Sequence, residues 1–187
     1  VKQNGGQAIL TKNEHKTGTD RIYEVFQKIN SADIDLVMNL QGDEPLMNIE
    51  DIKNLNNKMI QTKSQLGTLA SNISDDKLYD DQNVVKVITK ESLDISEFPE
   101  ALDFIRKTSN VSENIYHHLG IYCYQLETLK NFVSYDQSHN EIKNKLEQLR
   151  ALDNNIKINV ALAKSSPIGV DTKEDYLALK KIMEYKA

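Results

Sequence analysis

The chain has 187 residues, about the length of one domain, and 39% of them are apolar, which is enough for a hydrophobic core. Its formal net charge of −5 argues against broad electrostatic binding to nucleic acid or to anionic membranes. Because Cys123 is the only cysteine, the chain can form neither an intrachain disulfide nor a cysteine zinc cluster. No apolar run approaches the ~18–20 residues that span a bilayer.

The first 40 residues predict a strand, a helix and a second strand. Ala8–Leu10 is a candidate short strand, and Thr19 is a candidate N-cap after a polar loop. The helix after Thr19 carries apolar residues at helical spacing, namely Ile22, Val25, Phe26 and Ile29. The apolar run Ile34–Leu40 predicts the next strand.

The middle of the chain continues this alternation. A helix is expected from about Asn48 to Ile60, and strands are expected at Leu66–Ile73 and Val84–Ile88, with a helical turn at Ser74–Tyr79 between them. Ala101–Arg106 fits either a strand or a helix.

The second half predicts two more strands and three more helices. His117–Tyr124 is expected to be a central strand, and Ile156–Leu162 alternates as a half-buried strand does. The expected helices are Leu126–Val133, Glu141–Leu152 and Lys173–Tyr185. Strands that alternate with helices predict an α/β fold, a three-layer α/β/α arrangement with a mixed, mostly parallel sheet. No repeat or linker divides the chain, so one domain is expected over residues 1–187.

The loop Leu40–Leu46 (LQGDEPL) lies between a predicted strand and a predicted helix. Ligands of open α/β sheets bind at the carboxyl ends of strands, where this loop is expected. Two adjacent carboxylates, Asp43 and Glu44, beside Gly42 suit a hydrated cation such as Mg²⁺ that holds phosphates. A surface turn explains the same residues equally well, so the loop alone leaves both interpretations open.

Further short motifs accompany QGDEP in a fixed order: HKTGTDR at 15–21, NVVKV at 83–87, HLGIY at 118–122, EQLR at 147–150 and GVDT at 169–172. In this combination the chain resembles the CMP-Kdo synthetase family, the 3-deoxy-manno-octulosonate (Kdo) cytidylyltransferases of lipopolysaccharide synthesis. The resemblance runs from about Gly5 to the C-terminus.

The resemblance implies a nucleotidyltransferase with a nucleotide-diphospho-sugar transferase-like fold. CTP and Kdo would be its substrates, CMP-Kdo and pyrophosphate its products, and Mg²⁺ its cofactor. It also implies a cytoplasmic homodimer. Three alternatives stay open: a related enzyme for another 2-keto sugar acid, a glycosyltransferase with a related nucleotide fold, and a non-catalytic fragment or binding module of this fold.

The resemblance assigns the metal to Asp43 and Asp171, which are also the predicted catalytic residues. A turn role competes for Asp43, and an N-cap role competes for Asp171, which comes just before the last predicted helix.

The nucleotide is assigned to the loop before the first helix and to the QGDEP loop, through Thr17, Gly18, Gln41 and Pro45. The free N–H groups of a helix start favour such a ligand, although simple capping of the helix is the competing interpretation.

The resemblance assigns Kdo to residues from three motifs: Arg106, His118, Tyr122, Glu147 and Gln148. His118 and Tyr122 are four residues apart on a predicted strand, so they are expected to share one face. Helical spacing alone would make Glu147 and Gln148 solvated surface residues. Arg106 would bind the carboxylate of the sugar acid, with a surface arginine as the alternative.

The family's arginine- and lysine-bearing loop, of the form PARxxSTRLPGKPL, has no counterpart in this sequence. We therefore expect an N-terminally truncated domain, from which two βα units of roughly 60 residues are missing before Val1. The segment at 101–106 reads ALDFIR where the family has ALYFSR, which keeps Arg106 but loses a tyrosine and a serine.

Overall fold

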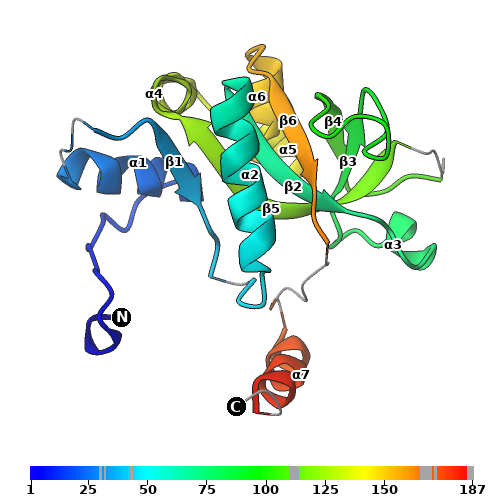
Figure 1. Cartoon of the computed structure of the whole chain (residues 1–187), viewed down its shortest axis with the longest axis horizontal. Coiled ribbons are helices and arrows are strands. Elements are labelled where there is room, and N and C mark those ends of the chain that lie inside the picture. Colours follow the sequence, from blue (N-terminus) through cyan, green and yellow to red (C-terminus); the bar gives the residue numbers. More distant parts are fainter. Residues whose placement is uncertain are drawn as a thin grey trace.

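The computed structural model describes residues 1–29, 31, 33–42, 44–109, 114–164, 170 and 172–184, without the side chains of Asp175, Met183 and Glu184. Figure 1 shows a central sheet with helices around it. The helices are η1 (Lys2–Asn4), α1 (Gly18–Ile29), α2 (Ile49–Thr62), α3 (Lys77–Asp80), α4 (Leu126–Ser134), α5 (His139–Asn144), α6 (Leu149–Asp153) and α7 (Lys173–Glu184). The strands are β1 (Leu36–Asn39), β2 (Leu66–Ser71), β3 (Lys86–Thr89), β4 (Ala101–Ile105), β5 (Ile115–Gln125) and β6 (Ile158–Leu162).

The sheet has six strands in the order β4-β3-β5-β2-β6, and β1 also pairs with β5. The predicted mixed α/β sheet is confirmed, but the expectation that most of its strands run parallel is wrong. Only β2 and β6 pair in parallel among the described strands, and β5 runs antiparallel to β1, β2 and β3. One reason is that β3 and β4 follow each other with no helix between them, which permits antiparallel pairing.

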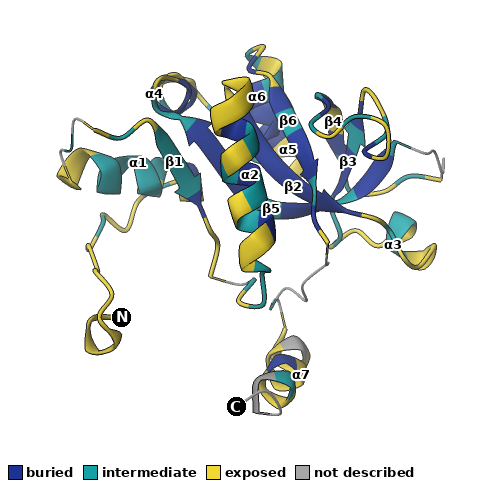
Figure 2. Cartoon of the chain, viewed as in Figure 1, coloured by how far each residue is buried: buried dark blue, intermediate teal, exposed yellow. Residues whose placement is uncertain are grey.

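Helices cover both faces of the sheet, as predicted. On one face α2 packs through Leu55 and Met59 against Leu69 of β2 and Ile121 of β5. On the other face the core includes residues of α4 and α6, namely Leu129, Phe132, Leu149 and Ala151. Figure 2 shows the strands mostly buried and the outer side of α2 exposed. In the described part of the chain, no helix is both long and apolar enough to cross a membrane.

The structure corrects two predicted elements and decides a third. Ala8–Leu10 forms no strand, and these residues are exposed. The predicted helix Glu141–Leu152 is two short helices, because Lys145 adopts a left-handed conformation (φ 54°) and ends α5. Ala101–Ile105 is a strand. The break at Lys145 places Glu147 and Gln148 in a turn before α6, which matters for the site.

Candidate active site

The candidate site lies along one edge of β5, between the residues that pair with β3 and those that pair with β1. β2 pairs along the other edge of β5, whereas β3 pairs with residues 115–117 and β1 with residues 122–125. Between these two pairings, Gly120 donates its N–H to Glu44 Oε1 (3.2 Å). A Cβ at Gly120 would lie 3.4 Å from Gln41 Nε2, an ordinary van der Waals contact, so the QGDEP loop packs directly against the strand at this residue. The loop after β1 thus covers residues 118–121 of β5, which lie between the two pairings and are called here the split in the sheet.

His118 and Tyr122 share a face of β5, as their spacing predicted. Their ring centroids are 5.5 Å apart, and both side chains are buried. Leu119 and Ile121 belong to the core on the opposite face. The sequence thus predicted correctly which residues of this strand point together.

His118 is a neutral hydrogen-bonding group. Burial, and to a smaller extent the neighbouring His117, lowers its pKa to about 3. Its Nε2 lies 2.9 Å from Thr68 Oγ1, and that hydroxyl donates to the carbonyl of Ile121 (2.7 Å). Because the hydroxyl proton is used there, Nε2 carries the histidine proton and Nδ1 is left as an acceptor.

Two carboxylates act on the buried phenol of Tyr122. Burial raises its pKa, and Tyr124, Glu147 and Glu44 add to the effect. The phenol therefore stays protonated. The QGDEP loop and the α5–α6 turn, distant in the sequence, are both near enough to Tyr122 for their carboxylates to affect it.

Glu147 is turned inward, contrary to what helical spacing alone suggested. Its Oε1 is buried and has no hydrogen-bond partner among the described residues. Burial raises its pKa, while the hydroxyls of Thr19 and Thr17 and the charge of Arg150 oppose that rise. Gln148, which precedes α6, is also buried. Both residues face the interior because the chain breaks its helix at Lys145.

Gly18 is the first residue of α1, and Thr17 precedes it. The Thr17 hydroxyl donates to Asp20 Oδ2 (2.9 Å) and accepts from the Asp20 N–H (3.3 Å). Thr17 therefore caps the helix, and the prediction that Thr19 does so is wrong. Thr19 lies inside the first turn, where its buried hydroxyl is 3.2 Å from the Tyr124 hydroxyl.

Arg106 is bound to backbone carbonyls. Its Nε donates to Asn144 O, Nη1 to Gln82 O and Nη2 to Lys145 O, each at 2.9 Å. It thus holds the C-terminus of α5, next to the turn that carries Glu147. Its predicted contact with a sugar-acid carboxylate stays a prediction.

The fully buried Lys86, in the NVVKV motif, makes similar contacts. Its ammonium donates to the carbonyls of Asp81 (2.6 Å), Val84 (2.8 Å) and Arg106 (2.7 Å). Burial lowers its pKa.

The remaining predicted residues are at the QGDEP loop or outside the described part. Gln41 and Pro45 are exposed beside the split in the sheet. Asp43 and Asp171, the predicted metal ligands, lie outside the described residues. The described residues contain no group of three or more His, Cys, Asp or Glu side chains that could hold a metal ion. Glu44, the neighbour of Asp43, does bring a carboxylate to the split, and oxygen donors of this kind suit Mg²⁺.

Two residues that shape the site, Thr68 and Arg150, are not among the site residues predicted from the sequence. Thr68 sets the tautomer of His118, and no motif in the sequence marked it. Arg150 belongs to the EQLR motif, so a signal was present, but its ion pairs with Asp20 and Glu141 join residues too far apart in the sequence to be predicted.

Comparison with known proteins agrees with this geometry. A family model described as cytidylyltransferase matches residues 1–158. The 3-deoxy-manno-octulosonate cytidylyltransferase of Bartonella tribocorum is 38% identical over 186 residues, which cover 98% of this chain and 75% of the relative. The protein of the same name from Thermodesulfovibrio yellowstonii is 39% identical, with coverage of 98% and 76%.

The structural comparison gives the same result. A CMP:2-keto-3-deoxy-manno-octonic acid synthetase complexed with CTP superposes with a TM-score of 0.86 at 30% identity, covering 100% of this chain and 76% of that one. An apo UDP-glucose pyrophosphorylase shares the fold, with a TM-score of 0.67 at 13% identity over 95% of this chain and 63% of the other. The chain belongs to the cytidylyltransferase family and, within it, to the 3-deoxy-manno-octulosonate cytidylyltransferases.

Proposed function

We propose that this chain transfers the cytidylyl group of CTP to Kdo, giving CMP-Kdo and pyrophosphate. In this reaction the anomeric hydroxyl of the sugar acid attacks the α-phosphorus of CTP, and pyrophosphate leaves. The observation that carries the proposal is the cluster of His118, Tyr122 and Glu147 at the split in the sheet, covered by the QGDEP loop. These are the residues that the family resemblance assigns to the sugar.

The described residues suit a polyhydroxylated, uncharged part of the substrate. Neutral His118 offers Nδ1 as an acceptor, and Glu147 offers a buried oxygen that lacks a partner among the described residues. A sugar hydroxyl that donates to Glu147 would satisfy that oxygen and would recover part of the free energy lost on burying it. Positioning of the two substrates is then the main contribution of these side chains.

Asp43 and Asp171 would hold Mg²⁺, which neutralises phosphate charge in reactions of this type. Thr17 and Gly18, with Gln41 and Pro45, would form the nucleotide side of the site. A cytoplasmic location, a homodimer and a place in lipopolysaccharide synthesis complete the proposal, and they rest on the family resemblance.

An assay of pyrophosphate release from CTP and Mg²⁺ tests the proposal. Kdo, an amino-substituted Kdo and a sialic acid are compared as acceptors, since a related 2-keto sugar acid is the alternative substrate. The assay is run on the 187-residue chain and on a chimera in which the N-terminal segment of the Bartonella tribocorum relative precedes it. The chimera tests whether activity needs the arginine- and lysine-bearing loop that the family resemblance implies and that this sequence lacks.

We expect Kdo to be the preferred acceptor and the chimera to be the more active protein. An inactive chimera would contradict the proposed function and would favour a binding module. A fully active short chain would show instead that the phosphate loop matters less than we expect.

A further inference from the structure

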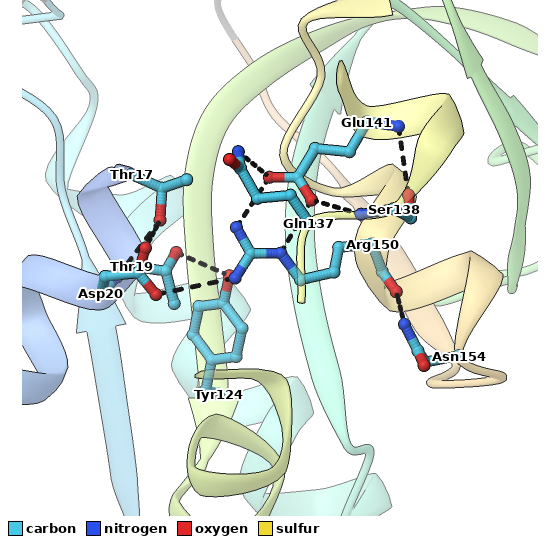
Figure 3. A network of polar contacts seen from close by, with 9 residues as sticks. All are labelled: Thr17, Thr19, Asp20, Tyr124, Gln137, Ser138, Glu141, Arg150 and Asn154. Atoms are coloured by element: carbon cyan, nitrogen blue, oxygen red, sulfur yellow. Dashed lines mark hydrogen bonds and ion pairs between the residues drawn. The ribbon is translucent and has the colours of Figure 1, made fainter. Parts of the chain in front are cut away.

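A buried ionic network joins the start of α1 to α5 and α6 (Figure 3). At its centre, Arg150 donates through Nε and Nη2 to both oxygens of Glu141, at 2.8 and 2.7 Å. Its Nη1 lies 3.6 Å from Asp20 Oδ1, and its guanidinium carbon is 4.5 Å from the centre of the Phe132 ring. Arg150 and Glu141 are almost completely buried, so the geometry of this pair is firmly held.

One end of the network reaches the nucleotide side of the proposed site. Asp20 uses Oδ1 for Arg150 and Oδ2 for the hydroxyl of Thr17, the residue that caps α1. The position of Thr17 and of the adjacent Gly18 therefore depends on a carboxylate that Arg150 orients.

The other end reaches the sugar side. The backbone N–H of Arg150 donates to the carbonyl of Glu147 (3.1 Å), so both residues belong to one turn. Glu141 fixes the far side of Arg150 and is itself held by Gln137 (3.0 Å) and by the Ser138 N–H (3.1 Å). Arg150 thus contacts the elements that carry both halves of the site, although its own side chain is buried among protein groups.

We propose that Arg150, acting through Asp20, is a positioning residue that couples the two substrate half-sites, so that binding of the sugar acid strengthens binding of CTP. This inference rests on the proposed function. An inward shift of Glu147 on sugar binding would move its turn and Arg150, and Asp20 would pass the constraint to Thr17. By thermodynamic reciprocity, CTP must then strengthen sugar binding by the same factor.

The test measures that factor in the absence of turnover. Calorimetry on the chimera described above gives the affinity for CTP with Mg²⁺, alone and with a saturating 2-deoxy derivative of Kdo, which lacks the attacking hydroxyl. In the chimera without further substitutions, taken here as wild type, the derivative is expected to raise the CTP affinity at least about fivefold. Asp20→Asn keeps an oxygen for the Thr17 hydroxyl but removes the charge that faces Arg150, and we expect the factor to fall below about twofold.

The matched control is Glu24→Gln, one turn further along α1. It also removes a carboxylate from an ion pair, with His15 and Lys28, but Glu24 is not among the residues that contact Arg150 in the network. We expect this variant to keep the wild-type factor, and Asp20→Glu to restore part of it. Because the Asp20 side chain is 23% exposed, Asp20→Asn is expected to fold, and a thermal melt checks this.

Each outcome decides one question. An unchanged factor in Asp20→Asn, or a wild-type factor of one, would overturn the coupling and leave the proposed function standing. Weaker binding of both ligands with an unchanged factor would show a merely structural role and would also overturn it. A folded wild-type chimera that binds neither ligand would contradict the proposed function itself, and the coupling with it.

Discussion

Two buried polar clusters, one around Arg150 and one around Tyr122, differ in how many of their hydrogen-bonding atoms have protein partners. Around Arg150, the guanidinium and the Glu141 carboxylate make charge-assisted hydrogen bonds with each other and with their neighbours. Around Tyr122, His118 keeps one ring nitrogen as an acceptor, and Glu147 Oε1 has no partner among the described residues. Buried polar groups are usually paired, so an exception calls for an explanation.

From this difference we infer that the Arg150 cluster is structural and that the Tyr122 cluster binds a ligand. A saturated network holds elements in place and has little capacity left for a substrate. A cluster with unmet capacity costs stability in the free protein, and a bound sugar can recover that cost. The following variants test this distinction, from the largest expected effect to the smallest.

Asp43→Asn should abolish turnover. If Asp43 holds Mg²⁺, loss of its charge removes several kcal/mol of transition-state stabilisation, which is at least about a 1,000-fold loss in kcat. A loop carboxylate contributes little to folding, so the free energy of unfolding should stay nearly constant. Steady-state kinetics and a urea titration measure the two quantities. Near-normal turnover would refute the ligand role.

Arg150→Met should destabilise the fold severely. The substitution leaves Glu141 buried without its cationic partner, which costs about 3–5 kcal/mol in the free energy of unfolding. Urea denaturation measures the loss. Lys157→Met is the control, since Lys157 forms an exposed pair with Glu100 (3.3 Å) that is expected to contribute at most about 1 kcal/mol. Equal losses in the two variants would show that the Arg150 network is not a structural centre.

Glu147→Gln should lower activity and raise stability. We expect kcat/KM for the sugar acid to fall about 10- to 100-fold, because a charged hydrogen-bond acceptor is lost. Burial raises the folded-state pKa of Glu147 above 4.5, so ionising it costs stability once the pH exceeds that value. The variant should therefore be more stable than the wild type at pH 7, by about 1 kcal/mol, and the gain should vanish below pH 4.5. Thermal melts across this range check the sign, and a destabilised variant at pH 7 would show that Glu147 is a structural group.

Arg106→Lys should affect stability more than substrate binding. Lysine cannot reproduce the fork with which Arg106 reaches three carbonyls, so we expect a loss of about 1 kcal/mol in the free energy of unfolding. KM for the sugar acid should rise less than about fivefold. A rise in KM above about tenfold, at unchanged stability, would instead support the prediction from the sequence that Arg106 binds the carboxylate of the sugar acid.

Residue periodicity predicted most of the fold. The spacing in HLGIY placed His118 and Tyr122 on one face of a strand, and the apolar runs located β1, β2, β3 and β6. It did not predict the strand directions, because a strand's pattern reads the same in a parallel or an antiparallel pair. Nor did it predict the break at Lys145, because the helical spacing of Ile142, Leu146 and Leu149 continues across the four residues that separate α5 from α6.

The candidate site was predictable mainly through its motifs. EQLR marked Glu147 and Gln148, although helical spacing alone would have placed them in solvent. Contacts between distant segments escaped prediction, as with Thr68 beside His118 and Asp20 beside Arg150. Such pairs depend on the tertiary arrangement, which no local pattern in the sequence encodes.

The most direct test of the central claim is to follow the products of CTP and Kdo by ³¹P NMR in the presence of Mg²⁺, with the chimera described above as enzyme. We predict a phosphodiester resonance of CMP-Kdo that grows in step with pyrophosphate and depends on both Kdo and Mg²⁺. Free CMP with pyrophosphate, or unchanged CTP from a folded chimera, would contradict it.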